Sequence, residues 1–388
     1  MKLSKLVLSI KPSATLKINE IANKLKSEGK DIIHLGGGEP EFDIPDGAKE
    51  EVIKKINTKR IRYTPTAGIK KLREEVLRYI SDIYKINVDI DNIVISTGAK
   101  QAIYNFLLSV VEPGDEVIII APYWVSYTEM ALMAYAHPVI VRPSNGLIPS
   151  IDDIKRCISS NTKLIMINSP NNPTGLVWPS ELISGVVKLA LDNNIYLLFD
   201  SIYDQLIIDD IDYKNPFSFV DDIEKSNIAI INGVSKAFSM TGFRIGFSIA
   251  SKELSNAMIK IQAQVTSCPC ELSQFAAIGA LREGKNFSKK LVSDLRIKRD
   301  ILVDELSKIK KAKFIKPQAT FYCFVDFSEY EKDSTKLSSI LIEKTGVVTV
   351  PGIEFGMEGY LRISFCSDVN SIKNGVSKIR NFLDGGNL

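Results

Sequence analysis

Two cationic side chains with different chemistry stand close together within residues 235–246. Lys236 follows the apolar stretch 227–232, which predicts a buried strand, and Arg244 lies in a second strand-like stretch, 243–250. A buried lysine is costly unless its amine is partly neutral, and a neutral amine can form a Schiff base with a carbonyl group. Arginine keeps its proton and therefore suits a permanent anion such as phosphate. An amine that can react with an aldehyde, next to a guanidinium group that can bind a phosphate, indicates pyridoxal phosphate as the ligand. The alternative is that both residues are solvated charges at an ordinary strand end.

A carboxylate and an anion-binding turn are predicted at the ends of two further strands. Asp200 follows the buried strand 195–199, where a lone carboxylate needs a positive partner. A pyridinium nitrogen would be such a partner, and the pairing would keep both groups charged. Gly98 separates the predicted strand 92–97 from a helix that opens at Ala99. Because the first N–H groups of a helix are free, this turn favours an anion.

The elements that position these residues alternate between strand and helix from about residue 45 to residue 270. This alternation predicts a mainly parallel sheet with helices on both faces, and the candidate residues stand at strand ends, where such sheets bind ligands. A long helical pattern over 271–310 is interrupted near 284–286. It leads into an α+β segment with strands expected over 321–325 and 360–365.

Composition excludes several classes of protein. The chain has 388 residues, enough for two or three domains, and its net charge of +3 is spread thinly. This charge indicates neither a nucleic-acid-binding nor a membrane-binding surface, and the longest apolar stretches are too short to span a bilayer. Five cysteines without a framework spacing predict reduced thiols in a cytoplasmic protein, and two isolated histidines argue against a metal site. No signal peptide is expected.

The sequence SKAFSMTGFRIG at 235–246 resembles the cofactor-lysine motif of the class I pyridoxal-phosphate aminotransferases. Similar matches follow in order along nearly the whole chain, and the most similar branch is that of the prokaryotic aspartate aminotransferases. The resemblance implies the α/β fold of type I pyridoxal-phosphate enzymes, in which a large domain has a mainly parallel, seven-stranded sheet and a small domain is α+β. It implies a division into 1–40 (the N-terminal segment of the small domain), 41–280 (the large, cofactor-binding domain) and 281–388 (the C-terminal small domain).

The matching motifs also imply the site residues. The catalytic ones are Lys236, Asp200 and Tyr203, and no metal is implied. The cofactor would be held by Gly98, Ala99, Lys100, Trp124, Asn172, Asp200, Tyr203, Ser235, Lys236, Arg244 and Tyr63, of which Tyr63 would reach the phosphate in the neighbouring subunit. The substrate would be held by Gly38, Trp124, Asn172, Arg362, Ser13 and Lys100.

Taken singly, several of these residues also fit simpler roles. Arg362 could be a surface-strand arginine instead of the clamp on the substrate α-carboxylate, and Tyr63 and Trp124 could serve packing alone. Lys100 and Ser13, implied to bind a distal carboxylate, could be a solvated side chain and a helix N-cap.

Two positions depart from the family pattern. Ser201 stands where many members have glutamate, and the segment 317–322, PQATFY, replaces P-x-G-A-F-Y and would alter a loop that lines the site. The sequence predicts a homodimeric aminotransferase that moves the amino group of aspartate or glutamate to a 2-oxo acid such as 2-oxoglutarate. The alternatives are an aromatic or broad-specificity aminotransferase, a carbon–sulfur β-lyase on the same fold, and a non-catalytic binding protein.

Overall fold

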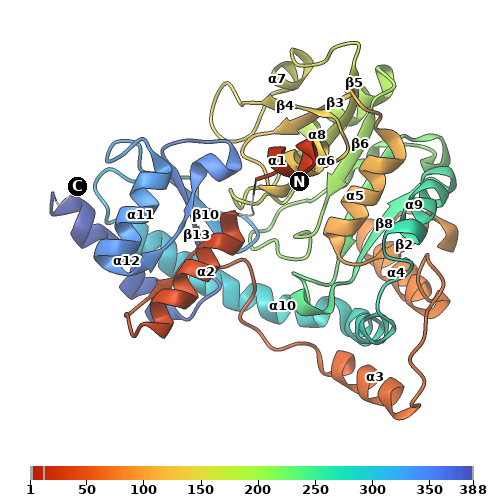
Figure 1. Ribbon diagram of the computed structural model, residues 1–388, viewed down its shortest axis with the longest axis horizontal. Helices are drawn as coiled ribbons and strands as arrows, with labels where there is room; N and C mark the ends of the chain where they lie inside the picture. The colour runs from red at the N-terminus through yellow and green to blue at the C-terminus, as the bar shows by residue number, and fades with distance from the viewer. Residues whose placement is uncertain (1–2, 12–13, 387–388) are drawn as a thin grey trace.

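A seven-stranded sheet forms the centre of the computed structural model (Figure 1). The structure describes residues 3–11 and 14–386. Strand β8 runs antiparallel to both of its neighbours and all other pairs are parallel, which confirms the mainly parallel sheet. In spatial order the strands are β2 (Ile93–Ser96), β8 (Gly246–Ala250), β7 (Ile228–Gly233), β6 (Tyr196–Asp200), β5 (Thr162–Asn168), β3 (Glu116–Ile120) and β4 (His137–Val141).

Helices cover both faces of this sheet, because successive strand residues point to opposite faces and both sets are apolar. On one face of the sheet, the strand side chains form a core with apolar side chains of three helices: α5 (Ala99–Val110), α6 (Ser126–Met133) and α9 (Lys252–Val265). On the opposite face, the strand side chains form a second core with apolar side chains of α4 (Lys70–Tyr84), α8 (Ser180–Asp192) and the first part of α10 (Glu271–Leu306). Helix α3 (Asp46–Asn57) packs on α10, and α7 (Ile151–Lys155) lies beside α8.

A second group of elements packs around a four-stranded antiparallel sheet, seen at the left of Figure 1. Its strands, in spatial order, are β12 (Val350–Pro351), β13 (Tyr360–Ser364), β10 (Tyr322–Asp326) and β9 (Lys313–Phe314). A separate parallel pair joins β1 (Ile33–His34) to β11 (Val347–Val348), which brings the N-terminal segment to the C-terminal third of the chain. The helices of this group are α2 (Ala14–Ser27), α11 (Ser334–Thr345) and α12 (Val369–Asp384).

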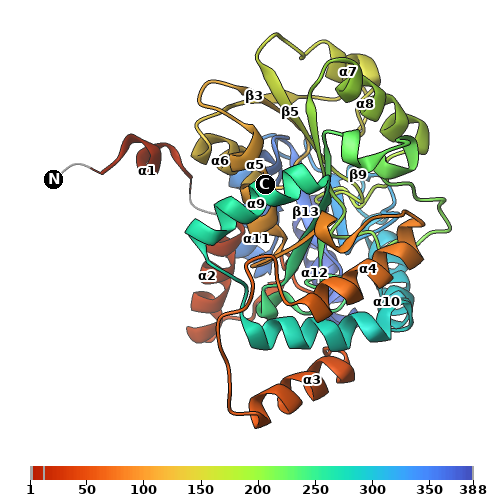
Figure 2. The same cartoon turned by 90° about the vertical axis from the view of Figure 1, so that its right-hand side faces the viewer.

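Helix α10 links the two groups, and Gly284 breaks its regular conformation with a φ of 51°. This break lies within the interruption predicted near 284–286. The short helix α1 (Lys5–Ser9) projects from the body and lies beside α6 (Figure 2). Five 3₁₀ turns complete the described elements: η1 (Ile90–Asn92), η2 (Pro216–Phe219), η3 (Ile223–Lys225), η4 (Thr241–Phe243) and η5 (Gly352–Phe355).

The prediction that a strand begins at residue 243 and contains Arg244 is wrong. The strand begins at Gly246, and Arg244 follows the turn η4 in a left-handed conformation with a φ of 54°. The reason is close packing: a Cβ on Gly246 would lie 2.2 Å from the amide nitrogen of Ala99, so the chain presses against the start of α5. The left-handed turn then directs the Arg244 side chain to that helix end.

No helix within 3–11 or 14–386 is long and apolar enough to cross a membrane. All five cysteines are free, as the sequence predicts.

Candidate active site

A cavity of about 470 Å³ lies at the carboxyl ends of the central strands and is closed on one side by β10 and β13. Most of the residues that the sequence assigns to a site line this one cavity, although they come from segments spread over more than 300 positions. They are Gly38, Ala99, Lys100, Trp124, Asn172, Asp200, Tyr203, Ser235, Lys236, Arg244 and Arg362.

Lys236 is partly buried just beyond the end of β7, and its Nζ donates a hydrogen bond to the carbonyl oxygen of Gly38 at 2.7 Å. Burial lowers the pKa of Lys236 to about 8; the Glu39 charge opposes this shift, and the Arg362 charge adds to it. A lysine with this pKa has a substantial neutral fraction near neutral pH, so its amine can act as a nucleophile and as a base.

Asp200 ends β6 as a buried carboxylate, with one oxygen accepting hydrogen bonds from Tyr127 Oη at 2.7 Å and the other from the Ile202 amide at 3.1 Å. Burial raises the pKa of Asp200 to about 6, although these two bonds and the Lys236 charge act in the opposite direction. The carboxylate therefore lacks a cationic partner that fully stabilises its charged form, and a protonated ring nitrogen would be such a partner. Sequence reasoning assigned no role to Tyr127.

Gly98 and Arg244 form a cradle at the start of α5. Gly98 has a φ of 80°, and a Cβ added to it would lie 2.5 Å from Arg244 Nη2, so glycine is required here. Nη1 of Arg244 donates to the Thr241 carbonyl oxygen at 2.8 Å, which orients the guanidinium group. Free N–H groups at a helix start beside a guanidinium group suit a phosphate.

Arg362 lies on β13 with only 2% of its surface exposed. Its Nη1 donates to Asn172 Oδ1 at 3.0 Å, and its Nη2 donates to the Gly36 carbonyl oxygen at 2.9 Å. The guanidinium carbon lies 4.2 Å from the Tyr322 ring centroid and 5.2 Å from that of Phe355. Nε has no hydrogen-bond partner among the described residues. A buried donor of this kind is suited to a carboxylate that enters the cavity.

Aromatic side chains line the rest of the cavity. Tyr203 Oη lies 3.4 Å from Tyr322 Oη, and burial raises the pKa of Tyr203 well above its ordinary value. Lys100 Nζ lies 4.9 Å from the Trp124 ring centroid, and the Trp124 ring meets Tyr127 edge to face.

Sequence reasoning missed several contacts in the site. Asn168 donates to the Asp200 carbonyl oxygen and accepts from the Asn172 amide, so it joins two neighbouring strand ends. The position of Asn168 at the end of a predicted strand could have identified it as a site residue, whereas nothing in the sequence pointed to Phe355. The structure does not bring Tyr63 into this cavity, because its side chain is 91% exposed. Ser13 lies outside the described residues.

A family model, Aminotransferase class I and II, matches residues 30–379. The chain belongs to this family. It is 38% identical over 389 residues to the probable aspartate/prephenate aminotransferase of Rickettsia conorii, covering 97% of both chains. It is 34% identical to the aspartate aminotransferase of Thermotoga maritima, covering 98% of this chain and 99% of the relative. The aspartate aminotransferase of Thermus thermophilus, solved with maleate, superposes with a TM-score of 0.94 at 33% identity, covering 99% of this chain and all of that one.

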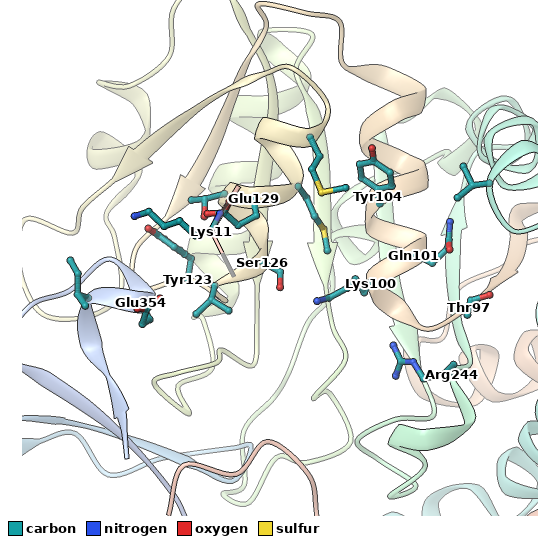
Figure 3. Close-up of a pocket in the computed structure, with 16 residues that line it drawn as sticks. Lys11, Thr97, Lys100, Gln101, Tyr104, Tyr123, Ser126, Glu129, Arg244 and Glu354 are labelled. Atoms are coloured by element: carbon teal, nitrogen blue, oxygen red, sulfur yellow. Dashed lines mark hydrogen bonds between the residues drawn. The ribbon is translucent and has the colours of Figure 1, made fainter. Parts of the chain in front are cut away.

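These matches span both groups of elements, so this aminotransferase has the fold of the family from end to end, as the resemblance implied. A second cavity, of about 420 Å³, adjoins the first and shares Lys100, Ser126 and Arg244 with it. Figure 3 shows Lys100 extending from α5 into this space, with Arg244 below it and Tyr123 and Glu129 on the far side.

Proposed function

We propose that this aminotransferase uses pyridoxal 5′-phosphate to move the amino group of aspartate or glutamate to a 2-oxo acid. One observation carries the proposal: a single cavity contains a lysine with a lowered pKa, a buried carboxylate and two arginines in separate places. These four groups match, in turn, the aldehyde, the ring nitrogen and the phosphate of the cofactor, and the carboxylate of an amino acid.

The residues present fit the cofactor. The Gly98 turn, Ala99, Ser235 and Arg244 would hold its phosphate, in a cradle that a Cβ at Gly98 would fill. Trp124 would cover the ring, Asp200 would meet the ring nitrogen, and Asn172 and Tyr203 would bond the phenolic oxygen. When bound, the cofactor supplies a protonated ring that accepts the electron pair left on the substrate Cα.

The remaining steps belong to the chain's own residues. Arg362 binds the substrate α-carboxylate, with Gly38 alongside, so that the Cα–H bond lies within reach of Lys236. The Lys236 amine would take the proton from Cα as general base and then deliver it as general acid to the cofactor carbon C4′. Its lowered pKa suits both transfers. Asp200 keeps the ring nitrogen protonated throughout.

The proposal of a dicarboxylic substrate rests on Lys100, whose ammonium group would bind the distal carboxylate. The ammonium group lies over the Trp124 ring, and no ion pair or hydrogen bond to an acidic side chain engages it among the described residues. Partial burial, and then the Arg244 charge, lower the pKa of Lys100. A distal carboxylate would offset both effects. The relatives named for aspartate, and the relative solved with maleate, a dicarboxylate, support this substrate class. Several relatives are also named for prephenate, whose second carboxylate the same cation would suit.

Changing Lys100→Ala is expected to lower kcat/KM for aspartate and glutamate by about 10- to 100-fold, the worth of one charge-assisted hydrogen bond. Alanine and phenylalanine, which lack a distal carboxylate, should change little. Initial rates with this panel of donors, against 2-oxoglutarate, oxaloacetate and prephenate, test the substrate class directly. An equal fall for all donors would assign Lys100 to the cofactor phosphate, and a wild-type preference for aromatic donors would contradict the aspartate assignment.

We also propose that two copies of the chain share their active sites through Tyr63. The residues around this exposed tyrosine are firmly held: the Arg62 amide bonds Glu271, and the Thr64 hydroxyl accepts from the buried Gln274. An exposed tyrosine between anchored neighbours is suited to contact another molecule. Further exposed apolar residues occur on α3, on the segment after it and at the end of α9: Ile53, Ile56, Ile61 and Val265.

A mixture of Lys236→Ala and Tyr63→Ala proteins is expected to recover activity that neither protein has alone. In a hybrid dimer, one site combines an intact Lys236 with the partner's intact Tyr63, so roughly a quarter of all sites would be complete after random exchange. Activity assays after subunit exchange, with hybrids counted by native mass spectrometry, measure this recovery. Hybrids without recovered activity would mean that Tyr63 serves its own subunit.

We finally propose that residues 1–40 and 281–388 form a small domain that closes over a large domain, 41–280. Support comes from an apolar core that joins Leu35 to side chains of the chain's last third, such as Leu302 and Ile379, and that also takes in a few residues after β6, among them Leu206. The pairing of β1 with β11 links the same two segments.

A further inference from the structure

The connecting segment 317–322 departs from the family pattern and has no part in the function proposed above. Its backbone is bonded to two loops that follow central strands. The Ala319 amide donates to the Gly175 carbonyl oxygen at 2.8 Å, and the Thr320 amide donates to the Leu206 carbonyl oxygen at 2.9 Å. These loops also carry Asn172 and Tyr203 of the site, so the segment is fixed to the walls of the cavity before it enters β10.

Thr320 adopts a strained backbone conformation within this segment. Its φ is 63°, in the left-handed region that β-branched residues very rarely occupy, and the residue is fully buried. Such strain persists only where the surroundings over-determine it, and it is concentrated at functional sites. The threonine hydroxyl takes part in holding the turn, because Oγ1 accepts a hydrogen bond from the Tyr322 amide at 3.1 Å.

Two aromatic residues follow the strained turn: Phe321, which is buried near Lys236, and Tyr322, which lines the cavity. The Phe321 ring centroid lies 5.9 Å from Lys236 Nζ. The next residue, Tyr322, stacks on the Arg362 guanidinium group at 4.2 Å and approaches Tyr203 through its hydroxyl group. A guanidinium group is planar, so a ring stacked on it fixes the plane in which its N–H groups point.

We propose that Thr320 is a positioning residue for substrate binding: its hydroxyl group fixes the turn that presses Tyr322 against Arg362. It touches neither substrate nor cofactor and acts on the α-carboxylate through these two side chains. The inference rests on the proposed role of Arg362 as the carboxylate clamp. Because every amino acid has an α-carboxylate, the effect of Thr320 must be the same for all donors, unlike that of Lys100.

Thr320→Val, which keeps the branched shape and loses the hydroxyl group, is expected to raise KM by about 2- to 10-fold, the worth of one hydrogen bond. The rise should be equal for aspartate and alanine, with kcat changed by less than roughly twofold. The dissociation constant of maleate from the holoenzyme, a probe that needs no turnover, should rise by the same factor. Thr320→Ser, which restores the hydroxyl group, should return both constants to the wild-type range.

Two further variants separate positioning from stability. Thr320→Gly removes the strain together with the hydroxyl group, so it should melt at a higher temperature than Thr320→Val and yet bind maleate as weakly. Thr162→Val is a control variant at the end of β5 that lies away from the cavity. It removes a buried hydroxyl group that bonds Glu116, and it should change the melting temperature without changing KM.

The proposal is overturned if Thr320→Val binds substrate like the wild type, if Thr320→Ser is as impaired as Thr320→Val, or if Thr320→Gly binds normally. Arg362→Lys tests the underlying function separately. If Arg362→Lys leaves aspartate and maleate binding intact, the clamp itself is wrong. If it weakens both while Thr320→Val does not, only the inference about Thr320 fails.

Discussion

Replacing Lys236 with alanine is expected to abolish multiple turnover while the protein still folds and binds the cofactor without a covalent bond. The variant loses the general base and acid, worth about 100- to 10,000-fold in rate, and also the amine that releases each product from the cofactor. Steady-state assays with aspartate and 2-oxoglutarate measure the loss. Borohydride reduction of the wild-type holoenzyme, followed by peptide mapping, should place the pyridoxyl label on Lys236.

The stability of the cofactor-free variant distinguishes a lost catalyst from a damaged fold. Burial lowers the pKa of Lys236 to about 8, so the charged amine destabilises the folded state as the pH falls through that value. Removing it should leave the protein at least as stable as the wild type at pH 7. Lys298→Ala is a matched control, because Lys298 is a buried lysine whose ammonium group bonds Asp294 and the Cys366 carbonyl oxygen. It should lower stability and keep turnover. A label on any other lysine would disprove the assignment.

The strands of the central sheet could be predicted because their signal is local. Ile93–Ser96 and Tyr196–Asp200 are short apolar stretches bounded by turn residues, and their ends agree with the predicted ranges 92–97 and 195–199 to within one residue. Residues at such ends meet at one edge of a parallel sheet whatever their separation in sequence. For this reason Asp200 and Lys236 could be assigned to one site in advance.

Contacts between distant segments could not be predicted in this way. The carbonyl oxygens of Gly36 and Gly38 accept hydrogen bonds from Arg362 and Lys236, and no periodicity reports which backbone oxygen will face which side chain. The left-handed conformation of Arg244 is set by the close approach of Gly246 to α5, which is a tertiary effect. Local patterns therefore predict where a functional residue stands in its element, and packing decides what it touches.

The Asp200–Tyr127 pair illustrates this limit and leads to a second large effect. Asp200→Asn preserves the shape of the side chain and removes its charge, so nothing would hold the ring nitrogen in its protonated form. We expect kcat to fall by about 100- to 1,000-fold, as is typical when a single preorganised electrostatic contact is lost, while substrate affinity changes little. Tyr127→Phe removes only the hydrogen bond to the carboxylate and should cost about 10-fold or less.

Stability should move in the opposite direction from activity in the cofactor-free Asp200→Asn protein. Burial raises the pKa of Asp200 to about 6, so the wild-type apoprotein loses stability as the pH rises through that value and the carboxylate ionises. The variant carries no such charge and should melt at a higher temperature than the wild type at pH 8, with the difference vanishing near pH 4. Thermal melts across this range, paired with kinetics of the holoenzymes, separate the two effects. A loss confined to KM would instead assign Asp200 to ground-state binding, and equal melting temperatures at pH 8 would mean that its carboxylate is not destabilised by burial.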